Sequence, residues 1–313
     1  MRKKIKMQVD NNVTLQEGVQ AYLNDLEARN CRAGTIRHYD IAVKQIYKII
    51  PPDTSIAELD KDTWDSFKIE IRCDGRNEMS CYTYCRDFKT LLRFFMKQEW
   101  LPQMALTLPK VDSTAVETYT DEELKKLLKR PNMRSCNFTE YKCWVMVNFL
   151  MSTGMRQHSL VNIKIRDVDF DTHTVTARVT KNRKVLIIPL NHDIEMILKE
   201  YLKYRKAKDD EYLFCNEFGN QLVKSTIYHQ MYWYNKNRGV ETTGIHRYRH
   251  TFAKKWVMMG GNVVALQKIL GHSSLAITQN YLNLLTSDVA KEMNEFNILR
   301  QFKSEAIKMN KSR

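Results

Sequence analysis

The stretch from His246 to Tyr281 places the tightest constraint on what this chain can fold into. His246 and Arg249 stand three residues apart, which puts both side chains on one face of a helix. Gly271 is typical of the end of the apolar helix that follows, so His272 is expected just beyond that helix. Tyr281 comes nine residues after His272. The spacing therefore predicts that two imidazoles, a guanidinium and a phenol converge within a short length of chain.

These side chains suit the chemistry of a phosphodiester. A guanidinium and imidazoles can bind the non-bridging oxygens of a phosphate, and a phenol can attack its phosphorus. Each residue alone has an ordinary explanation, because a lone Tyr is usually a core or surface aromatic and a lone His is usually structural. Only the combination favours a catalytic site.

The order H-x-x-R, then L-G-H, then a Tyr nine residues on resembles the signature of the tyrosine recombinase (phage integrase) family, in particular its two-domain, Xer-like members. A T-G-x-R run that ends at Arg156 matches the family's first catalytic arginine. Lys181 stands eight residues before a proline, where the family carries its hairpin lysine. Arg183 and Lys184 are close enough to compete for that role, as Tyr248 competes for the role of the nucleophile.

The resemblance implies a site-specific DNA recombinase of the integrase or excisionase type. Tyr281 would attack a DNA phosphodiester, leaving a 3′-phosphotyrosyl link and a free 5′-hydroxyl. Lys181 would protonate the departing oxygen, and His246 would assist proton transfer or orient the phosphate. No cofactor is implied, neither ATP nor a metal, because the phosphotyrosine conserves the bond energy. The implied catalytic residues are Arg156, Lys181, His246, Arg249, His272 and Tyr281.

One departure from the family pattern bears on this chemistry. Ser159 stands three residues after Arg156, where the family usually has an acidic residue that orients the active site. The change is expected to slow the reaction or to shift that support to another residue.

The charge of the chain predicts a polyanionic partner. Fifty Lys and Arg against 36 Asp and Glu give a formal net charge of +14. A membrane surface is the competing explanation, but no apolar run approaches the length of a bilayer span and the first residues lack a signal-peptide pattern. Cys81 and Cys85 stand four apart, which predicts one buried helix face rather than a zinc site. The cysteine pattern fits a reducing cytoplasm.

The periodicity of the 313 residues predicts a mainly α protein with a small β-sheet (α+β) in two domains. Capping boxes at Thr14 and Thr120 open the two domains, and Thr35 and Ser225 are expected to cap inner helices. Residues 174–179 and 185–188 predict a hairpin, and 212–214 a further strand. The predicted extents are a basic tail over 1–13, a helical core-binding domain over 14–101, a linker over 102–118, a catalytic domain over 119–285 and a C-terminal helix over 286–313.

In the family, the first domain clamps one side of a DNA duplex, and a helix of the second lies near the major groove. Any one basic residue is equally well explained as part of a solvated surface. The candidate DNA contacts are Arg32, Arg37, Lys44, Arg86 and Lys89 in the first domain, and Tyr228, His229, Lys236 and Arg238 in the second.

The resemblance also implies how the protein assembles and where it works. Its partner would be double-stranded DNA with specific recombination sites, and no membrane. Monomers in solution would form a homo-tetramer on synapsed DNA and exchange strands through a Holliday junction, a scheme that accommodates an accessory directionality factor. Apolar residues recur at helical spacing over 289–302, and this stripe would pack on its own domain or dock into a neighbour. A cytoplasmic, nucleoid-associated protein of a bacterium, phage or mobile element is expected.

Three other functions fit parts of the sequence. A type IB topoisomerase shares the chemistry but relaxes supercoils without a partner duplex, and the H-x-x-R, L-G-H, Tyr layout favours the recombinase. A non-catalytic DNA-binding regulator would share the charge and the fold, but it would not need all six active-site residues. A purely structural protein would make the cluster a coincidence.

Overall fold

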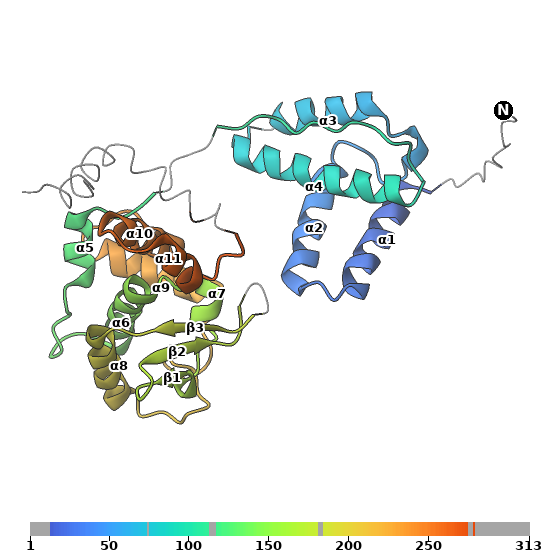
Figure 1. The fold of residues 1–313 in the computed structure, drawn as a ribbon. Helices are drawn as coiled ribbons and strands as arrows, with labels where there is room; N and C mark the ends of the chain where they lie inside the picture. The colour runs from blue at the N-terminus through green and yellow to red at the C-terminus, as the bar shows by residue number, and fades with distance from the viewer. Residues whose placement is uncertain (1–12, 74, 113–116, 181–183, 275–277, 279–313) are drawn as a thin grey trace, which may run out of the picture. The chain divides into compact units, whose positions relative to one another are not determined.

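The structure, a computed structural model, describes residues 13–73, 75–112, 117–180, 184–274 and 278. The chain forms two compact units that divide between residues 114 and 115, inside the predicted linker (Figure 1). The described part is mostly helical with a small antiparallel sheet, as the sequence predicted.

Among its described residues, the first unit has four α-helices, and α4 packs against each of the other three. Their apolar stripes meet in one core that includes Trp64, Phe67 and Phe88. The predicted capping box is confirmed, because Thr14 accepts a hydrogen bond from the backbone of Glu17 and the Glu17 carboxylate accepts one from Thr14 N. The helices are α1 (Leu15–Ala28), α2 (Ala33–Ile46), α3 (Lys61–Cys73) and α4 (Glu78–Lys97).

The first half of the predicted linker packs on this unit. Leu101 and Leu106 are buried in its core, and the Nζ atom of Lys89 donates a hydrogen bond to the Leu106 carbonyl oxygen. Cys81 and Cys85 are also buried there, as their spacing predicted. The linker residues up to Leu108 therefore pack against the core of the helical unit.

The central helix of the second unit is α6 (Phe138–Thr153), which is buried on most sides as predicted. Figure 1 shows α6 between α8 (His192–Arg205) and α10 (Ile245–Met258), and it packs against both. The Thr120 capping box opens α5 as expected. The remaining helices are α5 (Asp121–Leu128), α7 (Gln157–Leu160), α9 (Lys224–Lys236) and α11 (Val263–Leu270).

Among the described residues of this unit, three short strands form an antiparallel sheet in the order β1-β2-β3. β1 is Val168–Asp169, β2 is Thr174–Ala177 and β3 is Leu186–Pro189. Val175 pairs with Val168 on one side and with Ile188 on the other. Val175 and Ile188 are buried while Ile187 is exposed, so one face of the hairpin lies on the core.

Three local predictions were wrong. α2 starts at Ala33 and α9 at Lys224, so Thr35 and Ser225 lie inside the first turn, and neither helix has a side-chain cap. The segment over 212–214 is not a strand, because it forms only an isolated bridge from Tyr212 to Lys164. At both helices the residue in the N-cap position, Arg32 or Val223, makes no side-chain capping hydrogen bond, so the nearest capping residue type did not mark the start.

Candidate active site

Arg156 follows the sharp turn that ends α6. Gly154 closes that helix in the left-handed region, with φ of 59°. A Cβ atom added to Gly154 would lie 2.4 Å from Phe252 and 2.7 Å from Leu270. Only glycine fits there, because both the backbone conformation and the packing of α10 and α11 exclude a side chain. Arg156 then occupies the N-cap position of α7.

Arg249 lies on α10 with 4% of its surface exposed. Its Nη1 atom donates to the Gly154 carbonyl oxygen at 2.7 Å, and its Nη2 atom donates to the Leu270 carbonyl oxygen at 2.9 Å. These acceptors are at the C-terminal ends of α6 and α11, where the helix dipole is negative. The buried guanidinium is therefore stabilised by main-chain carbonyls, which also fix its plane.

The C-terminal end of α11 also holds Arg156. Gly271 closes α11 in the left-handed region, as the sequence predicted. Arg156 Nη1 lies 3.0 Å from the Leu270 carbonyl oxygen and 3.2 Å from that of Gly271. Both arginines thus donate to Leu270, and their guanidinium groups are brought together at one helix end.

His272 lies beside these arginines, just past α11. Arg249 Nη2 is 2.8 Å from His272 Nε2, and the Nδ1 atom of the same ring is 2.9 Å from Thr278 Oγ1. Burial and the charges of Arg249 and Arg156 lower the pKa of His272 to about 4. The imidazole is therefore neutral at pH 7 in the free protein.

Two further imidazoles share α10 with Arg249. His246 is exposed, and His250 is half-buried one helical turn later. Burial, together with His246 and Arg249, lowers the pKa of His250. The structure thus places His246 and Arg249 one turn apart on a single helix, as their spacing predicted.

A cleft of about 370 Å³ opens at the C-terminal end of α11, beside Gly271. Arg156, His272 and Lys184 are among the residues that line it. A 2.6 Å hydrogen bond from Thr180 Oγ1 to the Lys184 carbonyl oxygen joins the two sides of the hairpin next to its turn. Lys181, the candidate acid, lies outside the described residues. Lys184 is the hairpin lysine that the structure places at this cleft.

Ser159, the departure from the family pattern, is buried in α7. Its backbone N–H donates to the Arg156 carbonyl oxygen at 3.0 Å. Arg156 itself donates hydrogen bonds to carbonyl oxygens at the end of α11. The family usually has a carboxylate near this arginine, whereas here the acceptors belong to the main chain.

Tyr248, the competing nucleophile, is fully buried. Its hydroxyl donates to Asn235 Oδ1 at 2.7 Å, and Asn235 Nδ2 in turn donates to Tyr119 OH at 2.9 Å. Burial raises the pKa of Tyr248 well above its usual value. A hydroxyl so enclosed cannot reach a phosphodiester, so Tyr248 is excluded. Tyr281 and the C-terminal stripe lie outside the described residues.

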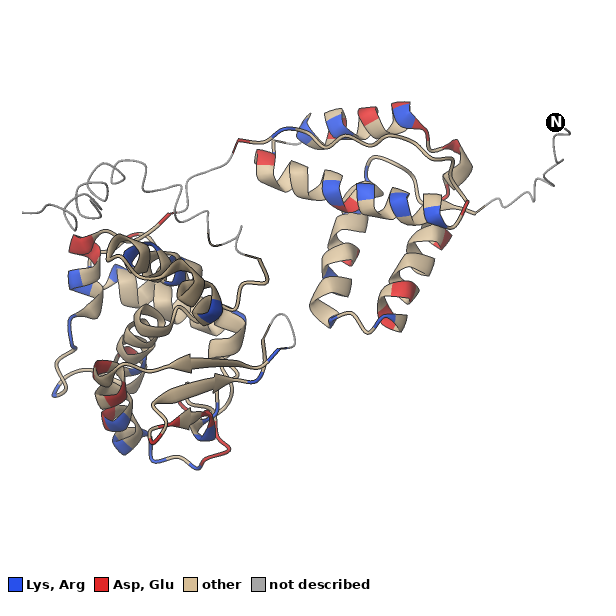
Figure 2. Ribbon diagram, viewed as in Figure 1, with Lys and Arg blue, Asp and Glu red and all other residues tan. Residues whose placement is uncertain are grey.

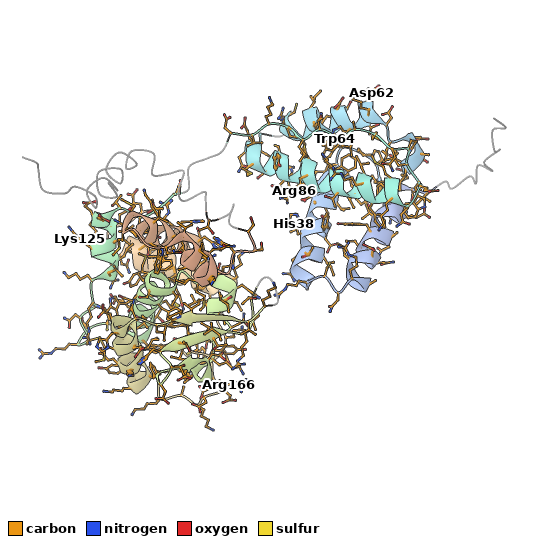
Figure 3. The ribbon with its side chains drawn as sticks, in the orientation of Figure 1. His38, Asp62, Trp64, Arg86, Lys125 and Arg166 are labelled. Atoms are coloured by element: carbon orange, nitrogen blue, oxygen red, sulfur yellow. The ribbon has the colours of Figure 1, made fainter. Side chains whose placement is uncertain are left out.

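The candidate DNA contacts of the first unit lie on α4, on α2 or, for Arg32, just before α2, and Figure 2 shows Lys and Arg recurring along α4. Arg37 and Lys44 are exposed. Arg86 is also exposed, although it lies 3.2 Å from the buried carboxylate of Asp87, which His38 contacts at 2.7 Å (Figure 3). Arg32 and Lys89 are half-buried. Lys89 already binds the Leu106 carbonyl, so part of its role is structural.

In the second unit, Tyr228, His229 and Lys236 are exposed on α9. Lys236 Nζ lies 5.1 Å from the ring centroid of Trp233, an exposed residue that the sequence did not single out. Arg238 differs from the others, because it lies 3.9 Å above the Tyr234 ring, pairs with Glu140 at 3.0 Å and keeps only 13% of its side chain exposed. Its charge is already engaged within the protein.

Sequence reasoning missed the carbonyls that hold the arginines and missed Thr278, whose only signal was its place three residues before Tyr281. Within the described ranges, no group of three or more His, Cys, Asp or Glu could hold a metal ion. No helix of the described chain has the length and apolarity needed to cross a membrane.

The chain is similar in sequence to known proteins. Residues 117–312, more than half of the chain, match the Phage integrase family. Tyrosine recombinase XerA of Saccharolobus solfataricus is 27% identical over 87% of this chain and 90% of its own length. Tyrosine recombinase XerC of Leptospira interrogans is 29% identical with the same coverage.

Solved structures show a similar fold. The Tn1549 transposon integrase, determined with transposon right end DNA, superposes with a TM-score of 0.75 at 18% identity and covers 91% of this chain and 100% of its own. A lambda integrase dimer bound to a core site gives a TM-score of 0.69 at 16% identity, with coverage of 86% and 95%.

Proposed function

The chain belongs to the phage integrase family, and from this membership we infer that it is a tyrosine recombinase, an enzyme that cleaves and rejoins DNA at specific sites. The curated relatives that match it along most of their length are themselves named tyrosine recombinases. The excess of positive charge supports a polyanionic substrate.

The observation that carries the proposed site is the sharing of one carbonyl by two arginines. Arg156 Nη1 and Arg249 Nη2 lie 3.0 Å and 2.9 Å from the Leu270 carbonyl oxygen, and Arg249 also contacts His272. Two guanidinium groups fixed this close suit a group that carries two anionic oxygens. We place the scissile phosphate here, with its non-bridging oxygens on Arg156, Arg249 and His272.

The chemical steps follow from that placement. Tyr281 attacks the phosphorus, the 3′-phosphate becomes linked to the tyrosine, and the 5′-oxygen departs as a hydroxyl. Lys181 supplies the proton for the departing oxygen, and His246 assists proton transfer or orients the phosphate. A 5′-hydroxyl from another strand then displaces Tyr281. The reaction is balanced without ATP or a metal, so cleavage in EDTA is expected.

The proposed assembly is a homo-tetramer formed on two synapsed sites by protomers that are monomeric in solution. The helical unit over 14–101 clamps one side of the duplex, the catalytic unit over 119–285 carries out the chemistry, and two rounds of cleavage pass through a Holliday junction. The stripe over 289–302 docks into a neighbouring protomer and couples the placement of Tyr281 to assembly. Such a protein acts on the DNA of a bacterium, phage or mobile element in the cytoplasm.

The nucleophile is tested with a nicked suicide substrate, which traps the covalent intermediate. Tyr281→Phe should abolish the DNA adduct and leave binding unchanged, because only the attacking oxygen is removed. Tyr204→Phe, at an exposed tyrosine of α8, is the matched control and should form adducts normally. Adduct formation by Tyr281→Phe would refute the assignment.

The exchanged helix is tested by deleting the chain from Lys291 onward. The truncated protein should fold and bind a single site, but it should form no synaptic complex in native gels and should not recombine. Truncated protein that unfolds, or that recombines normally, would show that the helix does not act on a neighbour.

A further inference from the structure

Thr278 joins the phosphate-binding site to the part of the chain that carries the nucleophile. The side chain is fully buried, and its Oγ1 atom lies 2.9 Å from Nδ1 of His272. In the sequence Thr278 stands three residues before Tyr281. No catalytic role was predicted for it.

The contacts of the His272 ring determine where its proton lies. An arginine side chain stays protonated in proteins and can only donate hydrogen bonds. Arg249 Nη2 lies 2.8 Å from His272 Nε2, so Nε2 must be the acceptor. A neutral ring that accepts at Nε2 carries its proton at Nδ1. That Nδ1–H donates to Thr278 Oγ1, so the hydroxyl oxygen is the acceptor that matches this tautomer.

We propose that Thr278 is a positioning residue for strand cleavage: its hydroxyl oxygen holds the Nδ1–H of His272 and so keeps Nε2 directed at the phosphate site beside Arg249. The proposal rests on the proposed function, because it assumes that His272 binds the scissile phosphate. Thr278 acts through His272 and does not itself touch DNA.

The arrangement has a consequence for catalysis. When a phosphate oxygen binds beside Arg249, it replaces His272 Nε2 as the acceptor for Arg249 Nη2. The negative charge of a bound phosphate favours protonation of the ring, so Nε2 can take up a proton from solvent and change from acceptor to donor. The Thr278 hydroxyl accepts the Nδ1–H in both protonation states, so the ring keeps its orientation.

The first experiment compares Thr278→Val with Thr278→Ser. Valine keeps the shape of the side chain and removes the hydroxyl, whereas serine retains the hydroxyl. Single-turnover cleavage of the suicide substrate should fall about tenfold or more in Thr278→Val, with unchanged DNA affinity, and should stay near wild type in Thr278→Ser. Equal rates for the valine variant and wild type would overturn the proposal.

A double-mutant cycle with His272→Ala tests whether Thr278 acts through the ring. Thr278→Val should have no further effect in the His272→Ala background, since the group that it positions is gone. Additive losses would mean that Thr278 only stabilises the fold locally. If His272→Ala itself cleaves normally, the proposed function of His272 fails instead, so the two failures are distinguishable.

A spectroscopic measurement decides the case without relying on activity. Imidazole ¹⁵N chemical shifts of the full chain should report an Nδ1–H tautomer for His272 in the wild type and in Thr278→Ser. Thr278→Val, or Thr278→Ala if the valine variant does not fold, should lose that tautomer's dominance. An unchanged tautomer in the variant without a hydroxyl would contradict the role assigned to Thr278.

Discussion

Two exposed cations of the first unit and two buried cations of the second are held in opposite ways. On the first unit, Arg37 and Lys44 project from an exposed helix face into solvent. In the second, Arg249 and Lys142 are almost fully buried and bind main-chain carbonyl oxygens. Exposed charges are screened and nearly interchangeable, whereas a buried charge acts at one fixed point. We therefore expect the first unit to contribute to DNA binding by the number of its charges, and the second to perform chemistry by their placement.

The sharpest test of fixed placement is Arg249→Lys. A lysine ammonium cannot span the acceptors on Gly154, Leu270 and His272 that the planar guanidinium reaches. Adduct formation should fall by about 10³-fold or more, although the charge is kept. Arg247→Lys, at the neighbouring residue paired with Glu117, is the control and should cleave at nearly the normal rate. A fully active Arg249→Lys variant would show that charge alone suffices.

The hairpin provides the next test, because two lysines compete for one role. If Lys181 is the general acid, Lys181→Ala should slow cleavage by about 10² to 10⁴-fold. A substrate with a 5′-bridging phosphorothiolate should restore the rate, since sulfur departs without a proton. Lys184 lines the cleft with Arg156 and His272, so the same pair of substrates is applied to Lys184→Ala. Rescue of that variant, with Lys181→Ala nearly normal, would assign the role to Lys184.

If the first unit binds DNA through the number of its exposed charges, removing some of them should have a smaller, graded effect on DNA affinity. Replacing Arg37 and Lys44 together with glutamine should weaken DNA binding, and each lost phosphate contact should reduce the slope of log affinity against log salt by about 0.9. The cleavage rate at saturating protein should not change. Arg29→Gln is the control, because Arg29 already pairs with Asp25 at 3.1 Å. An unchanged salt slope in the double variant would remove these residues from the DNA contacts.

The smallest effect is expected at Lys142, a buried cation with no part in the chemistry. Its Nζ atom donates to the Cys215 carbonyl oxygen at 2.8 Å, and burial lowers its pKa from the usual 10.5. Between that lowered pKa and 10.5, the unfolded chain binds more protons than the folded chain. The free energy of unfolding should therefore rise with pH in this window, by at most about 1.4 kcal/mol per pH unit.

Urea denaturation at pH 7.5 and pH 10 measures this dependence. Lys142→Met should lose the part of the pH dependence due to this residue, while cleavage at pH 7.5 changes less than about twofold. The exposed Lys125 on α5, labelled in Figure 3, provides the control Lys125→Met, which should keep the wild-type dependence. An identical pH dependence in wild type and Lys142→Met would mean that the buried amine does not titrate differently on folding.

The sequence by itself determined the local features of the site. The spacing of His246 and Arg249 put them one turn apart on α10, and Gly271 ended α11 in the left-handed conformation. The capping boxes at Thr14 and Thr120 were also predictable. Each of these depends on interactions within one or two helical turns, which the local order of residue types specifies.

Only the tertiary structure decided which atoms hold the arginines. Arg156 and Arg249 donate to the same carbonyl of Leu270, and α10 and α11 approach Gly154 closely enough to exclude any side chain there. Backbone carbonyls are present at every residue, so no sequence pattern marks the one that becomes an acceptor. The burial of Lys142 likewise depends on how distant helices pack, because packing determines which polar groups leave water and which partner then satisfies them.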